Sequence, residues 1–266
     1  MLIIAEKINA TIPLAKKVIE SRDREQLLTM AKNQADAGAS FIDINVGTGT
    51  GGQKEEIDAM HWAVSTIQEE IDTALCIDSA DPDVLAAGLE TRGDRPSLIN
   101  STKGSDTYLN AVVPLAKKYG HPLVGLAMDE AGIPKTVEKR IAACRKIANA
   151  CEKVGIGPER LFFDPLVLPI STDISQGKVT LDTISAIKKE IPGAQTVMAL
   201  SNISFGLPKR RIFNTAFLHM AIMAGLDAAI MNVLDSELVG AAKTAEAVMG
   251  KDRHCRKYAR FWRNTK

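Results

Sequence analysis

The amino-acid sequence predicts an α/β protein built as a single (β/α)8 barrel, and three observations support this fold class. Short apolar runs alternate with longer amphipathic segments, and about eight such pairs follow one another along the chain. A strict alternation of strand and helix predicts a parallel sheet with right-handed crossovers, and eight repeats predict that this sheet closes. The chain has 266 residues, 45% of them hydrophobic, which suits one barrel around one core.

The predicted strands are the short apolar runs, and the predicted helices fill the segments between them. The strands span residues 2–8, 41–46, 74–79, 97–101, 123–128, 161–167, 196–201 and 228–233. The helices lie near residues 23–37, 55–72, 82–92, 106–119, 135–154, 180–190, 209–225 and 236–249. Asp81 before Pro82 is typical of a helix start, and Gly38 and Gly155 fall just past expected helix ends. An open doubly wound sheet is the alternative, which we disfavour because the first strand is not followed by G-x-G-x-x-G.

We expect one domain over residues 1–250, followed by a basic C-terminal tail at residues 251–266. The tail contains seven Lys or Arg and a single Asp, interleaved with Tyr258, Phe261 and Trp262. The aromatic residues favour a last helix that packs on the barrel, and the alternative is a tail that extends to meet a partner.

The overall composition excludes several classes of function. The formal net charge is +1 and the charges are mixed along most of the chain, which gives no electrostatic reason to expect nucleic acid or a membrane surface as a partner. The four cysteines form no C-x-x-C pair, so no structural metal site is expected. Because the sequence has neither a signal-like start nor some 18 consecutive apolar residues, we expect a cytoplasmic protein.

Every predicted strand ends in an acid or an amide, and barrel enzymes build their sites at these carboxyl ends. In chain order these residues are Glu6, Asn9, Asp43, Asn45, Asp78, Asn100, Asp129, Asp164, Asn202, Asn232 and Asp235. Any one of them could equally cap a helix or form a turn. Core packing does not require carboxylates at one edge, however, so the complete ring indicates a ligand site.

The residue types in this ring narrow the class of ligand. No His stands at a strand end, and neither H-E-x-x-H nor a Ser-His-Asp arrangement occurs, so metal-assisted hydrolysis and acyl transfer lack their usual groups. The segment 47–52 is rich in glycine but lacks the Lys-Ser/Thr of a P-loop. Carboxylates accept from N–H groups while amides both donate and accept. The ring therefore suits a flat, nitrogen-rich heterocycle such as a pterin or a purine.

Seven short segments carry a family resemblance. They are AEKIN (5–9), IDINVG (42–47), CIDS (76–79), LINS (98–101), MD followed by GIP (128–134), FDP (163–165) and LSNISFGLP (200–208). In this order the chain resembles the methyltetrahydrofolate:corrinoid protein methyltransferases over nearly its whole length. This group of pterin-binding TIM barrels also includes dihydropteroate synthase and the folate domain of cobalamin-dependent methionine synthase.

The resemblance implies roles for individual residues. Asp78, Asn100 and Asp164 match the residues that hydrogen-bond the pterin ring, and Asn202 matches the amide near N5, the atom that carries the methyl group. Ser204, Gly206 and Arg210 match positions in the loop after the seventh strand, where contact with the folate or a partner is expected. The remaining folate-binding candidates are Glu6, Asp43 and Asn45.

Two positions depart from the family pattern. Lys7 stands where Arg is usual in the family. Residues 102–104, which come shortly after Asn100, differ from the family's loops at this place. Both departures leave the pterin-binding positions intact, so they bear on the partner or pathway more than on the ligand.

The implied chemistry is an SN2-like methyl transfer between N5 of (methyl)tetrahydrofolate and the cobalt of a corrinoid. Because N5 is a poor leaving group without a proton, and Asn202 is a neutral amide, we expect Asn202 to stabilise the transition state while the proton comes from solvent through Asp78 or Asp164. The chain lacks a D-x-H-x-x-G motif, so the cobalamin or related corrinoid must be carried by a separate protein. The resemblance also implies a homodimer. The direction of transfer is left open.

Two alternatives remain. A dihydropteroate synthase-like condensing enzyme has the same fold, but its usual basic groups are missing from residues 201–204 and from the last strand at 231–233. A non-catalytic folate-binding protein would use the same pterin contacts and is distinguished only by an assay.

Overall fold

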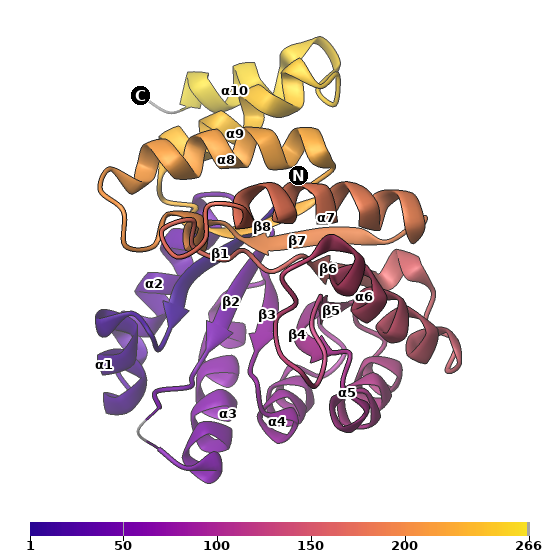
Figure 1. Cartoon of the computed structure of the whole chain (residues 1–266). Helices are drawn as coiled ribbons and strands as arrows, with labels where there is room; N and C mark the ends of the chain where they lie inside the picture. The colour runs from indigo at the N-terminus through magenta and orange to yellow at the C-terminus, as the bar shows by residue number, and fades with distance from the viewer. Residues whose placement is uncertain (50, 265–266) are drawn as a thin grey trace.

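A computed structural model describes residues 1–49 and 51–264 and confirms the predicted barrel. Eight parallel strands pair in chain order, and β1 pairs with β8 to close the sheet (Figure 1). The strands are β1 (Leu2–Asn9), β2 (Phe41–Asn45), β3 (Ala74–Asp78), β4 (Ser97–Lys103), β5 (Leu123–Leu126), β6 (Leu161–Asp164), β7 (Gln195–Ala199) and β8 (Ala228–Met231). Residue 50 of the glycine-rich segment and residues 265 and 266 of the tail lie outside the described part.

The helices surround the strands as an outer layer (Figure 1). The α-helices are α1 (Pro13–Ser21), α2 (Arg24–Asp36), α3 (Gln53–Glu70), α4 (Pro82–Arg92), α5 (Asp106–Tyr119), α6 (Val137–Glu152), α7 (Gln176–Glu190), α8 (Arg210–Ala224), α9 (Ser236–Val248) and α10 (Arg256–Asn264). Three short 3-10 helices are η1 (Pro158–Arg160), η2 (Leu200–Ser204) and η3 (Arg253–Cys255). None of the described helices is long and apolar enough to cross a membrane.

The barrel interior is a packed core. One layer draws an apolar side chain from seven of the eight strands: Ile4, Cys76, Leu98, Val124, Phe162, Val197 and Ala228. Such layers leave no channel through the barrel, so a ligand can bind only above them, at an end of the strands.

Helix α1 was not predicted from the sequence. It begins with Pro13 at its first turn, and its N-cap residue Ile12 makes no side-chain hydrogen bond to the helix, so the usual start signal is missing. Burial of Ala15, Val18 and Ile19 stabilises the helix instead.

The seventh strand is shorter than predicted. We expected it to reach residue 201, but β7 ends at Ala199 and the chain turns into η2. This turn buries the side chains of Leu200 and Ile203. Asn202 consequently lies on a turn above the barrel and is exposed.

The C-terminal segment packs on α9 through α10. The ring of Trp262 covers Gly240 so closely that a Cβ atom at Gly240 would lie 2.3 Å from it. Phe261 also packs against the apolar cluster formed by α8 and α9. A domain boundary at residue 250 stays a prediction.

Candidate active site

The register of the parallel strands brings three of the predicted residues together. Asn45 on β2 is paired with Asp78 on β3, and Asp78 is paired with Asn100 on β4. The Nδ2 atom of Asn45 donates to Oδ2 of Asp78 at 2.9 Å, and Oδ1 of Asn45 accepts from the amide of Gly47 at 3.0 Å. Asn45 therefore orients the Asp78 carboxylate.

Asp78 belongs to a group of acids that repel one another. Burial raises the pKa of Asp78 to about 6, although the hydrogen bond from Asn45 opposes the rise. Burial, followed by the charges of Asp78 and Glu6, also raises the pKa of Asp43 well above its usual value. The Oδ1 atom of Asp43 is buried and has no hydrogen-bond partner among the described residues. These carboxyl groups therefore titrate as a coupled set.

Glu6 links this acid group to a neighbouring basic edge. Burial raises the pKa of Glu6, and the charges of Lys7 and Arg210 partly oppose that effect. The residue lines a cavity of about 240 Å³ between β1, η2, α8 and β8. The other residues that line it are Lys7, Leu200, Ser201, Arg210, Arg211, Asn214, Met231, Asn232, Asp235 and Leu238.

Asp164 ends β6 on the other side of the mouth. Its Oδ1 atom accepts a hydrogen bond from the amide of Leu166 at 2.7 Å. Burial raises the pKa of Asp164 to about 7, and the charge of Asp78 adds to the rise. The Leu166 amide and the Arg140 guanidinium act in the opposite direction. Asp164 can consequently exchange a proton near neutral pH.

Arg140 on α6 supports the loop that follows Asp164, and sequence reasoning missed it. The guanidinium is completely buried, and its Nη1 atom donates to the carbonyl oxygens of Pro165 at 2.8 Å and Leu166 at 3.0 Å. Its Nη2 atom donates to Gln176 at 2.8 Å. A signal was present in the sequence, because Arg140 falls on the apolar stripe of its helix, four residues before the buried Cys144.

The predicted site residues in the loop after β7 differ in their exposure to solvent. Asn202 is exposed at the mouth, whereas Ser204 is completely buried. The Ser204 hydroxyl donates to Oδ1 of Asn214 at 2.7 Å and accepts from Nε of Arg210 at 3.1 Å. The structure therefore places Ser204 inside the loop, where its contacts with Asn214 and the exposed Arg210 hold the shape of the loop. Gly206 has a φ of +78°, a conformation that favours glycine.

The departure from the family pattern at residues 102–104 lies at the end of β4 and includes a contact with α5. Lys103 Nζ lies 4.0 Å from the centroid of the Tyr108 ring, so a cation–π contact holds this side chain beside α5. The neighbouring Thr102 hydroxyl is buried and has no hydrogen-bond partner among the described residues.

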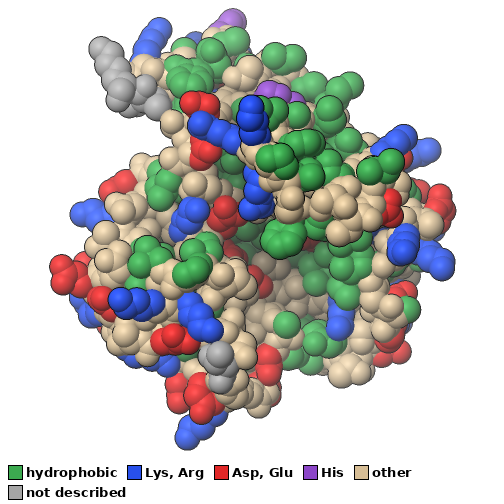
Figure 2. All heavy atoms as spheres, turned by 60° about the vertical axis from the view of Figure 1, so that its left-hand side comes forward, with side chains coloured by type: hydrophobic (Ala, Val, Ile, Leu, Met, Phe, Trp, Pro, Cys, Tyr) green, Lys and Arg blue, Asp and Glu red, His purple; other side chains and the backbone are tan. Residues whose placement is uncertain are grey.

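The carboxyl ends of the strands form a hollowed face. Figure 2 shows this face with acidic side chains in and around its central hollow and with Lys and Arg side chains along the upper edge. Within the described residues, no group of three or more His, Cys, Asp or Glu is placed to hold a metal ion. The arrangement offers buried acceptors to a ligand that brings its own N–H donors.

Comparison with known proteins identifies the family. Residues 7–232 match the pterin binding enzyme family. The chain belongs to the pterin-binding enzymes. This pterin-binding chain is 35% identical, over all of its length and 97% of the relative, to a methylcorrinoid:tetrahydrofolate methyltransferase from Eubacterium limosum. It is also 31% identical, over 87% of its length, to a methionine synthase from Mycobacterium leprae. The match covers 20% of that methionine synthase. The resemblance inferred from the seven segments is thereby confirmed.

Solved structures support the same fold. A DHPS from Yersinia pestis with a pterine-sulfa conjugate superposes with a TM-score of 0.72 at 19% identity, covering 94% of this chain and 93% of that one. A 7,8-dihydropteroate synthase from Vibrio fischeri gives a TM-score of 0.70 at 18% identity with the same coverage. At this level of identity the likeness establishes the barrel, and the roles of single residues stay predictions.

Proposed function

We propose that this pterin-binding enzyme transfers a methyl group between N5 of tetrahydrofolate and the cobalt of a corrinoid that a separate protein carries. One observation carries the proposal: Asp78 pairs with Asn100 on the neighbouring strand and its charge acts on Asp164, so these three residues gather at the mouth of the barrel, where Asn202 is exposed on the turn after β7. The whole-length match to a methylcorrinoid:tetrahydrofolate methyltransferase supports the same reaction.

The two carboxylates explain why a pterin would bind. Asp164 is buried and Asp78 is half-buried, and neither belongs to an ion pair among the described residues. Their raised pKa values show that burial disfavours the charged form. The ring N–H and amino groups of a pterin would supply the missing donors, and charge-assisted hydrogen bonds of this kind are short and strong. Binding of the ring would lower both pKa values again.

The mechanism requires one proton to move at N5. When the methyl group leaves methyltetrahydrofolate, N5 must gain a proton, and when tetrahydrofolate accepts a methyl group, N5 must lose one. Asn202 can hydrogen-bond N5 but cannot supply the proton, because a neutral amide does not ionise near pH 7. The proton would instead pass between solvent and N5 through Asp78 or Asp164, whose pKa values in the ligand-free protein are about 6 and about 7. Asn202 then orients N5 and stabilises the transition state.

An anaerobic spectrophotometric assay tests this proposal. Purified protein is mixed with methylcob(III)alamin and tetrahydrofolate, and in a second experiment with cob(I)alamin and methyltetrahydrofolate. We expect Asn202→Ala to lower the transfer rate by about 10²–10³-fold, which corresponds to about 2.7–4 kcal/mol for one transition-state contact, with little change in folate affinity.

Asn33→Ala is the matched control, because Asn33 is an exposed amide on α2. An undiminished rate in Asn202→Ala would remove this residue from the mechanism. Tight folate binding by the unaltered chain without any transfer would instead indicate a binding protein.

We further propose that the enzyme is a homodimer that pairs through the outer face of α8. Ile212, Phe213, Met220 and Met223 are between 39% and 75% exposed on this helix, opposite its buried side. The spacing of Ile212, Met220 and Met223 places them on one face. Met223 lies near the end of α8 remote from the mouth, where a partner that delivers cobalt has no need to reach. Sedimentation velocity should show a dimer for the unaltered chain and a monomer for Met223→Glu.

A cytoplasmic location completes the proposal. All four cysteines are free, and three of them are buried, which suits a reducing compartment. Fractionation of cells that express the native protein tests this placement, and recovery with a membrane or secreted fraction would contradict it.

A further inference from the structure

Two loops on one side of the mouth form a single wall. We define the loop wall as residues 165–175, which follow β6, and residues 200–209, which follow β7. The amide of Ile170 in the first loop donates to the carbonyl of Ile203 in the second at 3.2 Å. The two loops follow neighbouring strands of the barrel, and this backbone contact joins them.

Further contacts fix the two loops against each other. The hydroxyl of Ser171 donates to the carbonyl of Phe205 at 2.7 Å. Gly206 packs so that a Cβ atom on it would lie 3.5 Å from Oγ of Ser171. The buried guanidinium of Arg140 holds the start of the first loop through two backbone carbonyls. The loop wall is therefore ordered before any partner arrives.

The tips of the loop wall are apolar although they face solvent. Ile174 is 91% exposed, the largest value for a bulky hydrophobic residue in the described part of the chain, and Phe205 is 65% exposed. Polar residues flank Ile174 in the chain, with Asp173 before it and Ser175 after it. Apolar contacts within a polar rim are typical of protein interfaces.

The position of the loop wall indicates which protein would dock there. Asp164 immediately precedes the first loop, and Asn202 lies within the second. A protein that brings cobalt to N5 must approach over these residues and therefore against the loop wall. A second copy of the chain seated there would cover the entrance to the pterin site, so it is the less suitable occupant.

We infer that the loop wall is the docking surface for the corrinoid-carrying protein and that Ile174 and Phe205 are its apolar contacts. This inference rests on the proposed methyl transfer, because only that reaction requires such a partner. A surface that is already ordered loses little conformational freedom on docking, which suits a partner that must bind, react and leave repeatedly.

The test compares two methyl donors in the same set of variants. One donor is free methylcob(III)alamin, and the other is a purified corrinoid carrier protein reconstituted with it, chosen as one that the unaltered enzyme demethylates. The variants are Ile174→Ser, Phe205→Ser and the double substitution. Val248→Ser is the control, because Val248 is a similarly exposed aliphatic residue at the end of α9, away from the mouth.

We expect the double variant to lose tenfold or more in kcat/KM with the carrier protein, mainly through KM, while its rate with free methylcob(III)alamin stays within twofold. Unchanged activity with the carrier would overturn the inference, as would an equal loss with both donors, which would point to the folate site or the fold. A change in sedimentation of the variant chain alone would assign the surface to a second copy. Failure of the proposed function is a separate result, since the unaltered enzyme would then transfer from neither donor.

Discussion

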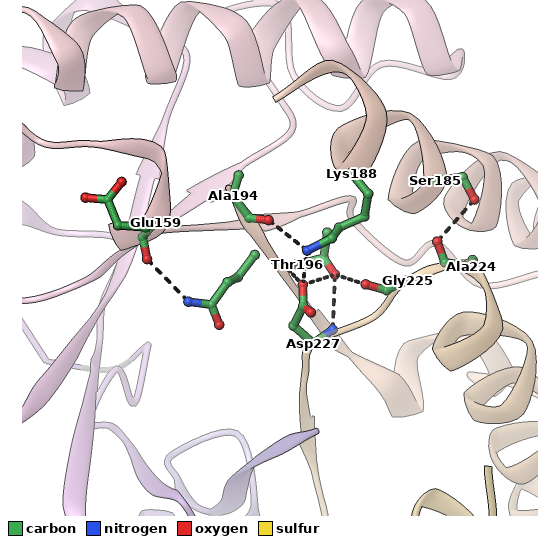
Figure 3. A network of polar contacts seen from close by, with 9 residues as sticks. Glu159, Ser185, Lys188, Ala194, Thr196, Ala224, Gly225 and Asp227 are labelled. Atoms are coloured by element: carbon green, nitrogen blue, oxygen red, sulfur yellow. Dashed lines mark hydrogen bonds and ion pairs between the residues drawn. The ribbon is translucent and has the colours of Figure 1, made fainter. Parts of the chain in front are cut away.

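The two ends of the barrel treat charged side chains in opposite ways. At the base, Lys188 Nζ lies 2.8 Å from Oδ2 of Asp227 and donates to the carbonyl of Ala194 at 2.9 Å (Figure 3). The amide of Thr196 donates to the same Asp227 oxygen at 2.9 Å. Lys188 and Asp227 therefore have partners within the chain, and together the contacts join α7 to the starts of β7 and β8.

At the mouth, three acids lack such partners, although Asp235 pairs with Arg211. Asp43 and Asp164 are buried and Asp78 is half-buried, and none of the three belongs to an ion pair among the described residues. Their pKa values are raised, whereas a carboxylate that is paired with a cation has a lowered one. The contacts of Lys188 and Asp227 at the base serve stability, while these three acids at the mouth stay available as acceptors for a ligand at a cost in stability.

Arg140 is the exception that sharpens this contrast, because it lies near the mouth but all of its contacts are within the chain. We expect Arg140→Met to lower the free energy of unfolding by about 3–5 kcal/mol, since it leaves the carbonyl oxygens of Pro165 and Leu166 buried without a donor. Urea denaturation measures the change. Folate affinity should fall as well, because the loop after Asp164 loses its support.

Arg140→Lys is the matched control. It keeps the charge but cannot form the forked contacts of a guanidinium. Its stability should therefore fall between those of the unaltered protein and Arg140→Met. If Arg140→Met is as stable as the unaltered protein, the loop after β6 does not depend on this side chain.

The base of the barrel should respond in stability alone. Asp227→Ala removes the acceptor that Lys188 and Thr196 share, and we expect a loss of about 2–3 kcal/mol in the free energy of unfolding. Asp227→Asn retains an oxygen for the Thr196 amide and should lose less. Folate affinity and transfer rate should stay within twofold in both variants. A large loss of folate affinity would show that the two ends of the barrel are coupled.

The sequence was sufficient to predict the barrel and most of the acids at its mouth. Eight apolar runs fix eight strands, and residues that end parallel strands must gather at one edge. This is why Asp78 and Asn100, which are 22 positions apart in the numbering, lie side by side on neighbouring strands. The family resemblance then supplied a ligand class, which the whole-length comparison supports.

The features that could not be predicted depend on tertiary packing. An arginine in an amphipathic helix ordinarily faces solvent, so nothing local distinguished Arg140 except its place on the apolar stripe. Ser204 stands in a polar run beside Asn202, and only the turn of η2 decides that the first is buried and the second exposed. Helix α1 lacks a capping side chain and is stabilised by contacts that its own sequence does not reveal.

Asp164→Asn at the mouth is expected to change the free energy of unfolding least. It should raise this free energy at pH 8, whereas Asp227→Ala at the base should lower it. Burial raises the pKa of Asp164 from 3.8 to about 7, so the folded state holds a proton that the unfolded state has released. The stability of the unaltered, ligand-free protein should therefore fall as pH rises from about 4 to about 7, and this contribution is absent from the variant. At pH 8 we expect Asp164→Asn to be more stable by about 1 kcal/mol, or about 2–4 °C in Tm, and to bind folate more weakly. Urea midpoints measured across this pH range for both proteins test the prediction. Parallel curves would mean that Asp164 is already compensated within the chain, and the mouth would then resemble the base.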